Sequence, residues 1–244
     1  MNCIKIILVE PAGERNIGSI ARVMRNMALD NLIIVNPRCN PLSEEARIMA
    51  VHGVSVLDKM KVVKSMAEAL QGCQRVVATT ARERDIFTPL ESPRSVIGWL
   101  KENHVTSALI FGPEDRGLSN QELSYAQRFI RIPSNPEYSS LNLAQAVGIC
   151  AYELYQFEQE SSSIATSVPK DLADLGELEG YYQHLESMLL DVNYLYPHTA
   201  PKKMEKLRRI VNRANLSSQE LTMIRGILRQ IQWHLNQVRS SGEK

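Results

Sequence analysis

The sequence predicts an α/β protein with a mostly parallel β-sheet, helices on both faces and a small α-helical extension at its carboxyl end. Two observations predict the sheet. Short β-branched runs alternate with longer helical patterns over the first 160 residues, and such alternation is typical of βαβ units. The runs are apolar at consecutive positions, as expected for strands that are buried on both faces. A change of composition between residues 160 and 170 predicts the separate extension.

Five strands are expected from these apolar runs. They are IKIILV at 4–9, NLIIV at 31–35, RVVAT at 75–79, SALIF at 107–111 and RFIRI at 128–132. Four of them are followed by polar segments: VEPAGERNIGSIAR, TTARER, FGPEDRGLSN and IPSNPEYSSLN. Because ligands of open α/β sheets bind at the carboxyl ends of the strands, we expect these four segments to form one site.

Helical spacing predicts helices between the strands. They are expected at 17–29, 44–51, 63–70, 93–101, 120–127 and about 141–158. Ser92 followed by Pro93 predicts an N-cap, and Ser119 with Glu122 predicts a capping box. The last helix start carries Ser139 and Ser140, which could cap the helix or help to hold an anionic group there.

The chain divides into a domain of residues 1–160, a Ser/Thr-rich linker at 161–170 and a helical extension at 171–244. Charge is uneven within the extension, although the net charge of the whole chain is only +1. Residues 171–191 carry six acids and no Lys or Arg, whereas residues 201–239 carry nine Lys or Arg against two Glu. Apolar residues at 221, 224, 228, 231, 235 and 238 follow a capping box at Ser217 and Glu220 and predict a helix.

Several classes of function are disfavoured. The apolar runs are too short to cross a bilayer and no signal peptide is recognisable, so a cytoplasmic protein is expected. Neither the four Cys nor the five His have the spacing of a metal site, so no metal is expected. The absence of GxGxxG, Walker A and HExxH sequences disfavours dinucleotide, P-loop and zinc-protease chemistry.

Each polar segment has an ordinary structural explanation when it is taken alone. NIGSIAR, with Asn16 and Arg22, could be a simple capped helix, although Gly18 and Ser19 would also admit another backbone or an anion. FGPEDRGL, with Glu114 and Arg116, could be a turn with a solvated ion pair. TTAR offers backbone donors and hydroxyls, and Arg82 and Arg84 could hold a phosphate.

Together, however, NIGSIAR, FGPEDRGL and IPSNPEYSSLNLAQAV resemble the three motifs of the SPOUT superfamily of RNA methyltransferases, in its TrmH-like 2′-O-ribose branch. The resemblance covers about residues 4–158. Within the branch, the chain is most similar to enzymes that modify cytidine or uridine at anticodon-loop position 32 of tRNA. The alternatives are another tRNA or rRNA position, a non-catalytic RNA-binding protein on the same scaffold, and an α/β enzyme that uses another nucleotide.

The resemblance implies a trefoil knot at the carboxyl end of the domain, S-adenosylmethionine as cofactor, tRNA as substrate and a homodimer with composite active sites. The implied cofactor-binding residues are Thr79, Thr80, Ala81, Gly112, Ile132, Ser139, Ser140 and Leu141. The residues implied around the ribose and the methyl group are Asn16, Arg22, Glu114, Ser140 and Asn142. The basic tail would contact the tRNA backbone, with an ordinary solvated helix face as the alternative.

The resemblance also suggests Arg22 as the base that activates the ribose hydroxyl, facing the cofactor of the partner subunit. A guanidinium keeps its proton in proteins, so we expect Arg22 instead to stabilise the developing oxyanion or to hold a neighbouring phosphate. The proton would then leave through Ser140, a phosphate or water.

Overall fold

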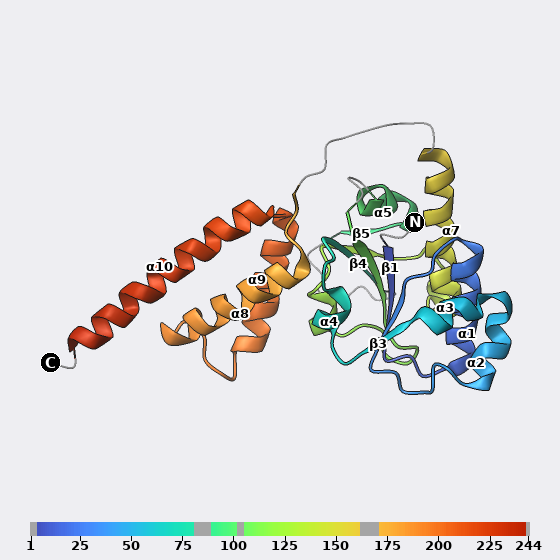
Figure 1. Ribbon diagram of the computed structural model, residues 1–244, viewed down its shortest axis with the longest axis horizontal. Coiled ribbons are helices and arrows are strands. Elements are labelled where there is room, and N and C mark those ends of the chain that lie inside the picture. Colours follow the sequence, from blue (N-terminus) through green and yellow to red (C-terminus); the bar gives the residue numbers. More distant parts are fainter. Residues whose placement is uncertain (1–3, 81–88, 102–104, 162–170, 243–244) are drawn as a thin grey trace. The chain divides into compact units, whose positions relative to one another are not determined.

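The computed structural model describes residues 4–80, 89–101, 105–161 and 171–242. The chain forms two compact units, Met1–Pro169 and Lys170–Lys244 (Figure 1). The first unit is an α/β domain and the second is entirely helical in its described regular elements. Ala81, Arg82 and Arg84 lie outside the described residues, as does most of the expected linker.

The first unit is built on a parallel sheet of seven described strands. They are β1 (Ile4–Val9), β2 (Leu32–Val35), β3 (Lys61–Val63), β4 (Arg75–Thr79), β5 (Leu90–Glu91), β6 (Ser107–Phe111) and β7 (Arg128–Ile130). Their order across the sheet is β3-β2-β1-β6-β4-β7-β5. Ile6 of β1 pairs with Leu32 on one side and Leu109 on the other, so β1 lies inside the sheet. All five expected strands are present, and the parallel sheet is confirmed.

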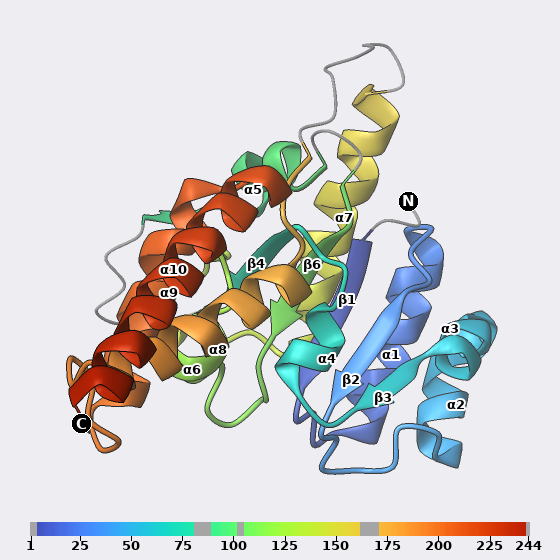
Figure 2. The same cartoon turned by 60° about the vertical axis from the view of Figure 1, so that its left-hand side comes forward.

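Helices cover both faces of this sheet (Figure 2). They are α1 (Glu14–Asn26), α2 (Glu44–Ala50), α3 (Val54–Lys59), α4 (Met66–Leu70), α5 (Pro93–Lys101), α6 (Asn120–Leu123) and α7 (Leu143–Ser161), with 3-10 turns at Val51–Gly53 and Pro136–Tyr138. Apolar residues of α1, α5 and α7, among them Ile17, Val96 and Val147, pack into one core with alternate strand residues such as Ile6 and Leu109. The strand residues between these, such as Ile7 and Ile110, are buried as well, as double-sided coverage requires.

Gly18 explains how α1 and α2 pack together. A Cβ atom at Gly18 would lie 2.2 Å from the carbonyl oxygen of Ala46, which no side chain tolerates. The small residue predicted to admit either a backbone or an anion therefore serves backbone packing. NIGSIAR accordingly lies in a helix that is held close to its neighbour at Gly18.

Several element boundaries differ from the sequence prediction. The first helix, expected at 17–29, spans Glu14–Asn26. The segment 63–70 is not one helix, because Val63 ends β3 and α4 begins only at Met66, after Ser65 caps it. The helix expected at 120–127 ends at Leu123. The last strand ends at Ile130, two residues before Ile132. The short elements β3, β5 and α3 were not predicted, because two to six residues carry too little periodicity to reveal them.

The second unit consists of α8 (Leu175–Asp191), α9 (Ala200–Ala214) and α10 (Ser218–Gly242). Capping boxes begin two of its helices. Asp174 with Glu177 begins α8 and was not predicted, whereas Ser217 with Glu220 begins α10 as predicted. The predicted apolar face of α10 is buried at Leu221 and Leu228 but 41% exposed at Ile231. No described helix is both long enough and apolar enough to cross a membrane.

Candidate active site

The described parts of the four polar segments converge as predicted, because the strands that precede them are neighbours. β1, β6, β4 and β7 lie side by side at the centre of the sheet and run parallel. Their carboxyl ends therefore share one edge, and the segments after them meet there.

A cavity of about 230 Å³ lies at this edge. Its lining comes from the segments that follow β4, β6 and β7 and from the start of α7. The lining includes Thr79, Thr80, Gly112, Glu114, Ile132, Ser139, Ser140 and Leu141, all of them predicted site residues. Apolar side chains such as Phe111, Leu118 and Ile130 form much of the remaining wall. Apolar walls with a few polar groups are typical of small-molecule sites.

Two glycines shape the loop after β6. A Cβ atom at Gly112 would lie 2.4 Å from the amide nitrogen of Leu118, so the two ends of the loop touch at this point. Gly117 has a φ of +66°, a conformation that residues with side chains rarely adopt. The loop therefore folds back tightly on itself and turns its backbone toward the cavity.

A chain of hydrogen bonds joins three predicted residues that are far apart in the sequence. The side-chain Nδ2 of Asn142 donates to Oδ1 of Asn16 at 3.0 Å, and Nδ2 of Asn16 donates to Oε1 of Glu114 at 2.9 Å. The second oxygen of Glu114 accepts from the backbone N–H of Ala12 at 3.1 Å. These hydrogen bonds thus link the start of α7, α1 and the loop after β6. Glu114 also lines the cavity and so connects the hydrogen bonds to it.

The orientation of both amides is fixed at the two ends of this chain. A carboxylate only accepts hydrogen bonds, so Asn16 must turn its NH₂ group to Glu114 and its oxygen to Asn142. At the other end, Oδ1 of Asn142 accepts from the backbone N–H of Ala144 at 2.9 Å, which leaves its NH₂ group for Asn16. The carboxylate of Glu114 and the first turn of α7 thus allow only one orientation of the two amides.

Asn142 is also the residue that caps α7. Capping by Ser139 or Ser140 was one of two explanations for a helix expected to start near Leu141, and the helix starts two residues later. The helix begins at Leu143, and Asn142 accepts from the backbone N–H groups of Ala144 and Gln145. Ser139 and Ser140 are consequently not engaged as caps and line the cavity instead.

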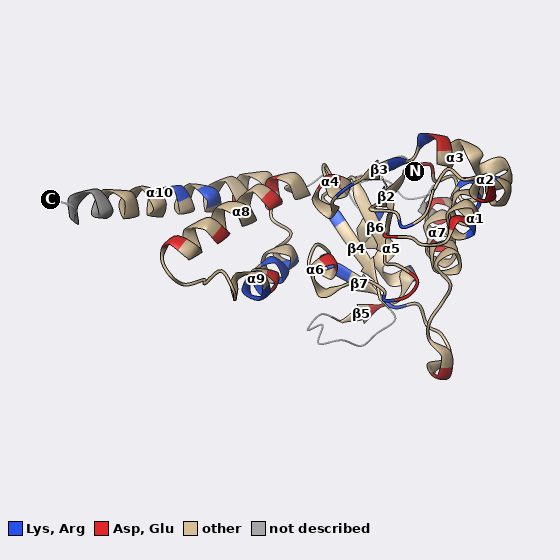
Figure 3. Ribbon diagram, turned by 90° about the horizontal axis from the view of Figure 1, so that it is seen from below, with Lys and Arg blue, Asp and Glu red and all other residues tan. Residues whose placement is uncertain are grey.

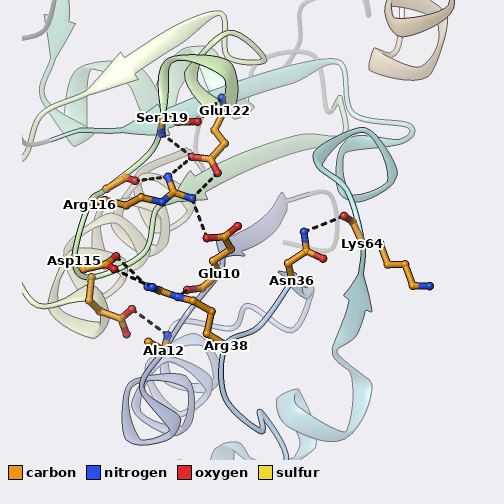
Figure 4. Close-up of polar contacts among 11 residues, drawn as sticks. Glu10, Ala12, Asn36, Arg38, Lys64, Asp115, Arg116, Ser119 and Glu122 are labelled. Atoms are coloured by element: carbon orange, nitrogen blue, oxygen red, sulfur yellow. Dashed lines mark hydrogen bonds and ion pairs between the residues drawn. The ribbon is translucent and has the colours of Figure 1, made fainter.

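Ion pairs that were not predicted from the sequence hold the loop after β6 (Figure 4). Arg116 donates to both oxygens of Glu122, at 2.9 and 3.0 Å, and to Glu10 at the end of β1, at 3.0 Å. Partial burial would raise the pKa of Glu122, but hydrogen bonds from Arg116 and Ser119 outweigh it and hold that pKa below its ordinary value. In place of the solvated ion pair that was the ordinary alternative for this segment, Arg116 joins a network that ties the loop to β1 and α6.

A second ion pair fixes the same loop from its exposed side. Arg38 binds both oxygens of Asp115, at 2.8 and 2.9 Å, and Figure 4 shows the two side chains facing each other. The hydrogen bonds from Arg38 lower the pKa of Asp115 to about 2. Arg38 also donates to the carbonyl oxygen of Glu10, so both ion pairs join the loop to the segment after β1.

Among the predicted site residues that the structure describes, Arg22 is the one that is not brought to the others. It is exposed on α1 and does not line the cavity. Gly53 packs closely against the backbone of Arg22, because a Cβ atom at Gly53 would lie 2.7 Å from the backbone nitrogen of Arg22. Its side chain therefore projects from a fixed point into solvent.

Comparisons with known proteins agree with this architecture. The model of the SpoU rRNA Methylase family matches residues 3–152, more than half of the chain, and the model of the tRNA methyltransferase TrmJ C-terminal domain matches residues 176–242. The tRNA (cytidine/uridine-2′-O-)-methyltransferase TrmJ of Pectobacterium atrosepticum is 41% identical over 94% of this chain and 96% of its own length.

Two solved structures resemble this chain to different degrees. TrmJ from Z. mobilis ZM4 is 34% identical with a TM-score of 0.85, over 93% of this chain and 98% of its own. A protein solved in a study of the 2-OH methylation of C/U34 on tRNA is 29% identical with a TM-score of 0.51, and the match spans 64% of this chain but 97% of that one. The resemblance to 2′-O-ribose methyltransferases is confirmed: the chain belongs to the SpoU rRNA Methylase family, among the relatives that also carry the TrmJ C-terminal domain.

Proposed function

We propose that the chain methylates the 2′-oxygen of a ribose in tRNA, with S-adenosylmethionine as methyl donor, at the cytidine or uridine of anticodon-loop position 32. The observation that carries this proposal is the hydrogen-bonded chain of Asn142, Asn16 and Glu114 beside a cavity lined by the expected cofactor residues. The relatives that are similar along the whole chain are named tRNA (cytidine/uridine-2′-O-)-methyltransferases. A tRNA substrate would be met in the cytoplasm.

The residues of the cavity fit S-adenosylmethionine. Apolar walls formed by Ile130, Ile132 and Leu118 suit an adenine ring, and the tight turn at Gly112 presents backbone groups without a side chain in the way. The cavity is smaller than the roughly 300 to 1,000 Å³ of sites for drug-sized ligands, so a ligand must bend or remain partly exposed. A bent cofactor, which the family resemblance implies, would suit such a cavity, and the knot remains a prediction.

S-adenosylmethionine supplies a methyl group that the ribose 2′-oxygen can attack in line. The work left to this chain is to position the ribose and to accept its proton. Hydrogen bonds to Glu114, to each other and to the backbone of Ala144 hold the amides of Asn16 and Asn142 in one orientation. The two side chains are therefore rigid enough to position a ribose hydroxyl. Glu114 keeps Asn16 in place. Ser140 lines the cavity and is exposed, so its hydroxyl can pass the 2′-proton to water.

The position of Arg22 supports a site shared between two copies of the chain. Arg22 points into solvent and does not line the cavity of its own chain, so a second copy must supply it if it acts on the substrate. Ile149 and Tyr152 on α7 are 37% and 48% exposed, and apolar exposure on a helix suits a covered interface. We therefore propose a homodimer in which Arg22 stabilises the oxyanion in the partner's site.

A mixing experiment tests the shared site. Arg22→Ala chains and Asn142→Ala chains are each expected to be inactive alone, whereas an unfolded and refolded mixture regains activity, because some dimers combine one intact Arg22 with the intact cavity of the other chain. No activity in the mixture, with dimers confirmed by size, would show that the site is not shared. An Arg22→Lys variant with full activity would reject a need for the planar guanidinium.

The purified protein should be given unmodified tRNA and rRNA transcripts together with S-adenosylmethionine. The expected product, located by mass spectrometry of nuclease fragments, is tRNA with one ribose methyl group at position 32. A methyl group at position 34 or on rRNA would show that the substrate is another tRNA position or an rRNA. No transfer to any RNA, despite binding of S-adenosylhomocysteine, would favour the non-catalytic alternative.

A further inference from the structure

One face of α9 is lined by cations. Lys202, Lys206, Arg209 and Arg213 are spaced four, three and four residues apart, which places them in one row along the helix. Three of them are exposed and Arg209 is partly exposed, while the opposite face of α9 buries Met204. Figure 3 shows the concentration of Lys and Arg on this helix. The row is about 16 Å long, from the rise of about 1.5 Å per residue, and spans several nucleotides of an RNA strand.

These four cations differ from Arg208 on the same helix. Arg208 binds both oxygens of Glu179, at 2.6 and 2.9 Å, and lies 4.4 Å from the centre of the Tyr182 ring. None of the four residues in the row forms an ion pair with a carboxylate of the described residues. Arg208 therefore stabilises the unit internally, and the row is available to an external anion.

Exposed aromatic rings precede this row. Tyr194 and Tyr196 are 57% and 50% exposed. Their loop is fixed, because the carbonyl oxygen of Tyr196 accepts from the N–H groups of Thr199 and Ala200, both at 2.8 Å. Lys203 donates to the carbonyl oxygen of Tyr194 and lies 4.8 Å from the centre of its ring. The ring of Tyr196 stacks on His198, with 6.0 Å between the ring centres. Both tyrosines nevertheless keep about half of their surface exposed, on an ordered backbone just before α9.

From these features we infer that the second unit binds an unpaired stretch of RNA on a surface formed by Tyr194, Tyr196, Lys202, Lys206, Arg209 and Arg213. The cations would follow the phosphates, and the two rings would stack on unpaired bases. This combination is the usual means of binding single strands, because every base has a face that can stack. An acidic polypeptide would use the cations but not the rings. The inference rests on the proposed function, since an anticodon loop offers unpaired bases.

The cations are tested by salt dependence in the full chain. A K202Q/K206Q/R213Q variant is compared with a K59Q/K61Q/K64Q control, which removes three exposed lysines of the first unit. The probes are an RNA hairpin with an unpaired loop and a duplex of equal length. We expect the first variant to lose at least tenfold in hairpin affinity and to lower the slope of log K against log salt by about two to three, with the control close to wild type. Equal losses in both variants would overturn the assignment to α9.

The rings are tested by substitutions that separate stacking from hydrogen bonding. Tyr196→Phe and Tyr194→Phe are expected to bind the hairpin like wild type, and Tyr196→Ser and Tyr194→Ser to lose about tenfold for the hairpin but not for the duplex. Equal loss for both probes, or equal loss of polyglutamate binding, would contradict base stacking. Unfolding midpoints exclude misfolding of a variant.

Failure of this inference is distinguishable from failure of the proposed function. If the wild-type protein methylates tRNA and all these variants bind the hairpin as tightly as wild type does, the function stands and the surface is refuted. If the wild-type protein binds the hairpin through this surface but methylates no RNA, the surface stands and the activity is refuted.

Discussion

The charged residues of the two units are used differently. In the first unit, the cations beside the cavity are bound to carboxylates: Arg116 to Glu122 and Glu10, and Arg38 to Asp115. In the second unit, the cations of the row on α9 have no carboxylate partner among the described residues, whereas Arg208 of the same helix binds Glu179. A paired cation fixes the position of a loop or helix, whereas an unpaired row can attract a polyanion. The comparison separates the residues that build the protein from those that we expect to contact RNA.

The largest effect on activity is expected for the hydrogen-bonded residues Asn142 and Asn16, which are neither paired nor unpaired cations. Asn142→Ala and Asn16→Ala should lower kcat for tRNA methylation by about 10² to 10³, the usual effect of removing one group that positions or stabilises the reacting oxygen. S-adenosylhomocysteine binding, measured by calorimetry, should change little, because neither side chain lines the cavity. Asn135→Ala is the matched control, since its side chain caps only the turn at Pro136–Tyr138.

A comparable loss of cofactor binding in Asn16→Ala would contradict this account. It would mean that the hydrogen-bonded chain shapes the cavity and does not hold the ribose.

The next largest effect is expected on stability in the second unit. Arg208→Gln should destabilise the protein by about 2 to 3 kcal/mol, because it leaves the largely buried carboxylate of Glu179 without its partner. Arg213→Gln on the same helix should change stability by less than about 0.5 kcal/mol. Denaturant unfolding of both variants measures this difference. If both substitutions were equally harmful, the distinction between paired and unpaired cations would fail.

A smaller effect is expected for the network of the loop after β6. Glu122→Gln should cost about 1 to 2 kcal/mol at neutral pH, through the lost charge-assisted hydrogen bonds to Arg116. The folded-state pKa of Glu122 is lowered, so its contribution is present above the unfolded pKa of about 4.3 and is lost as the pH falls below that value. Unfolding free energies of wild type and variant should therefore approach each other in acid. A constant difference would refute the role of the ionised carboxylate.

The smallest effect is expected at the exposed pair of Arg38 and Asp115. Asp115→Asn should lower the unfolding midpoint slightly at low salt, and 1 M salt should abolish the difference, because solvent and salt screen exposed charges. The pKa of Asp115 is lowered to about 2, so the contribution fades as the pH falls from about 4 toward 2. A difference that persists in high salt would show that the bidentate hydrogen bonds matter more than the charges.

The presence of long elements was predicted better than that of short ones. The meeting of the polar segments at one edge of the sheet was predicted better than the contacts between individual side chains. β1, β6 and α5 begin and end where their apolar patterns do. The strand order was not predictable, since it depends on crossovers that periodicity does not encode. The hydrogen bond from Asn142 to Asn16 spans 126 residues and exists only because α7 packs beside α1.

The misplaced cap of α7 has a similar cause. Ser139, Ser140 and Asn142 are all good N-cap residues, so local preference could not choose among them. Tertiary contact with Asn16 selects Asn142, and the two serines are left to the cavity. The role of Arg116 was missed for the same reason, because its partner Glu10 lies 106 residues earlier in the chain.

The central claim is that this site delivers a methyl group to a ribose 2′-oxygen. A tRNA transcript with a single 2′-deoxynucleotide at position 32, incubated with the wild-type protein and radiolabelled S-adenosylmethionine, tests it most directly. We predict that the transcript binds as tightly as unmodified tRNA but takes up no label. Labelling at the level of unmodified tRNA would contradict the account, because the acceptor would then be another atom.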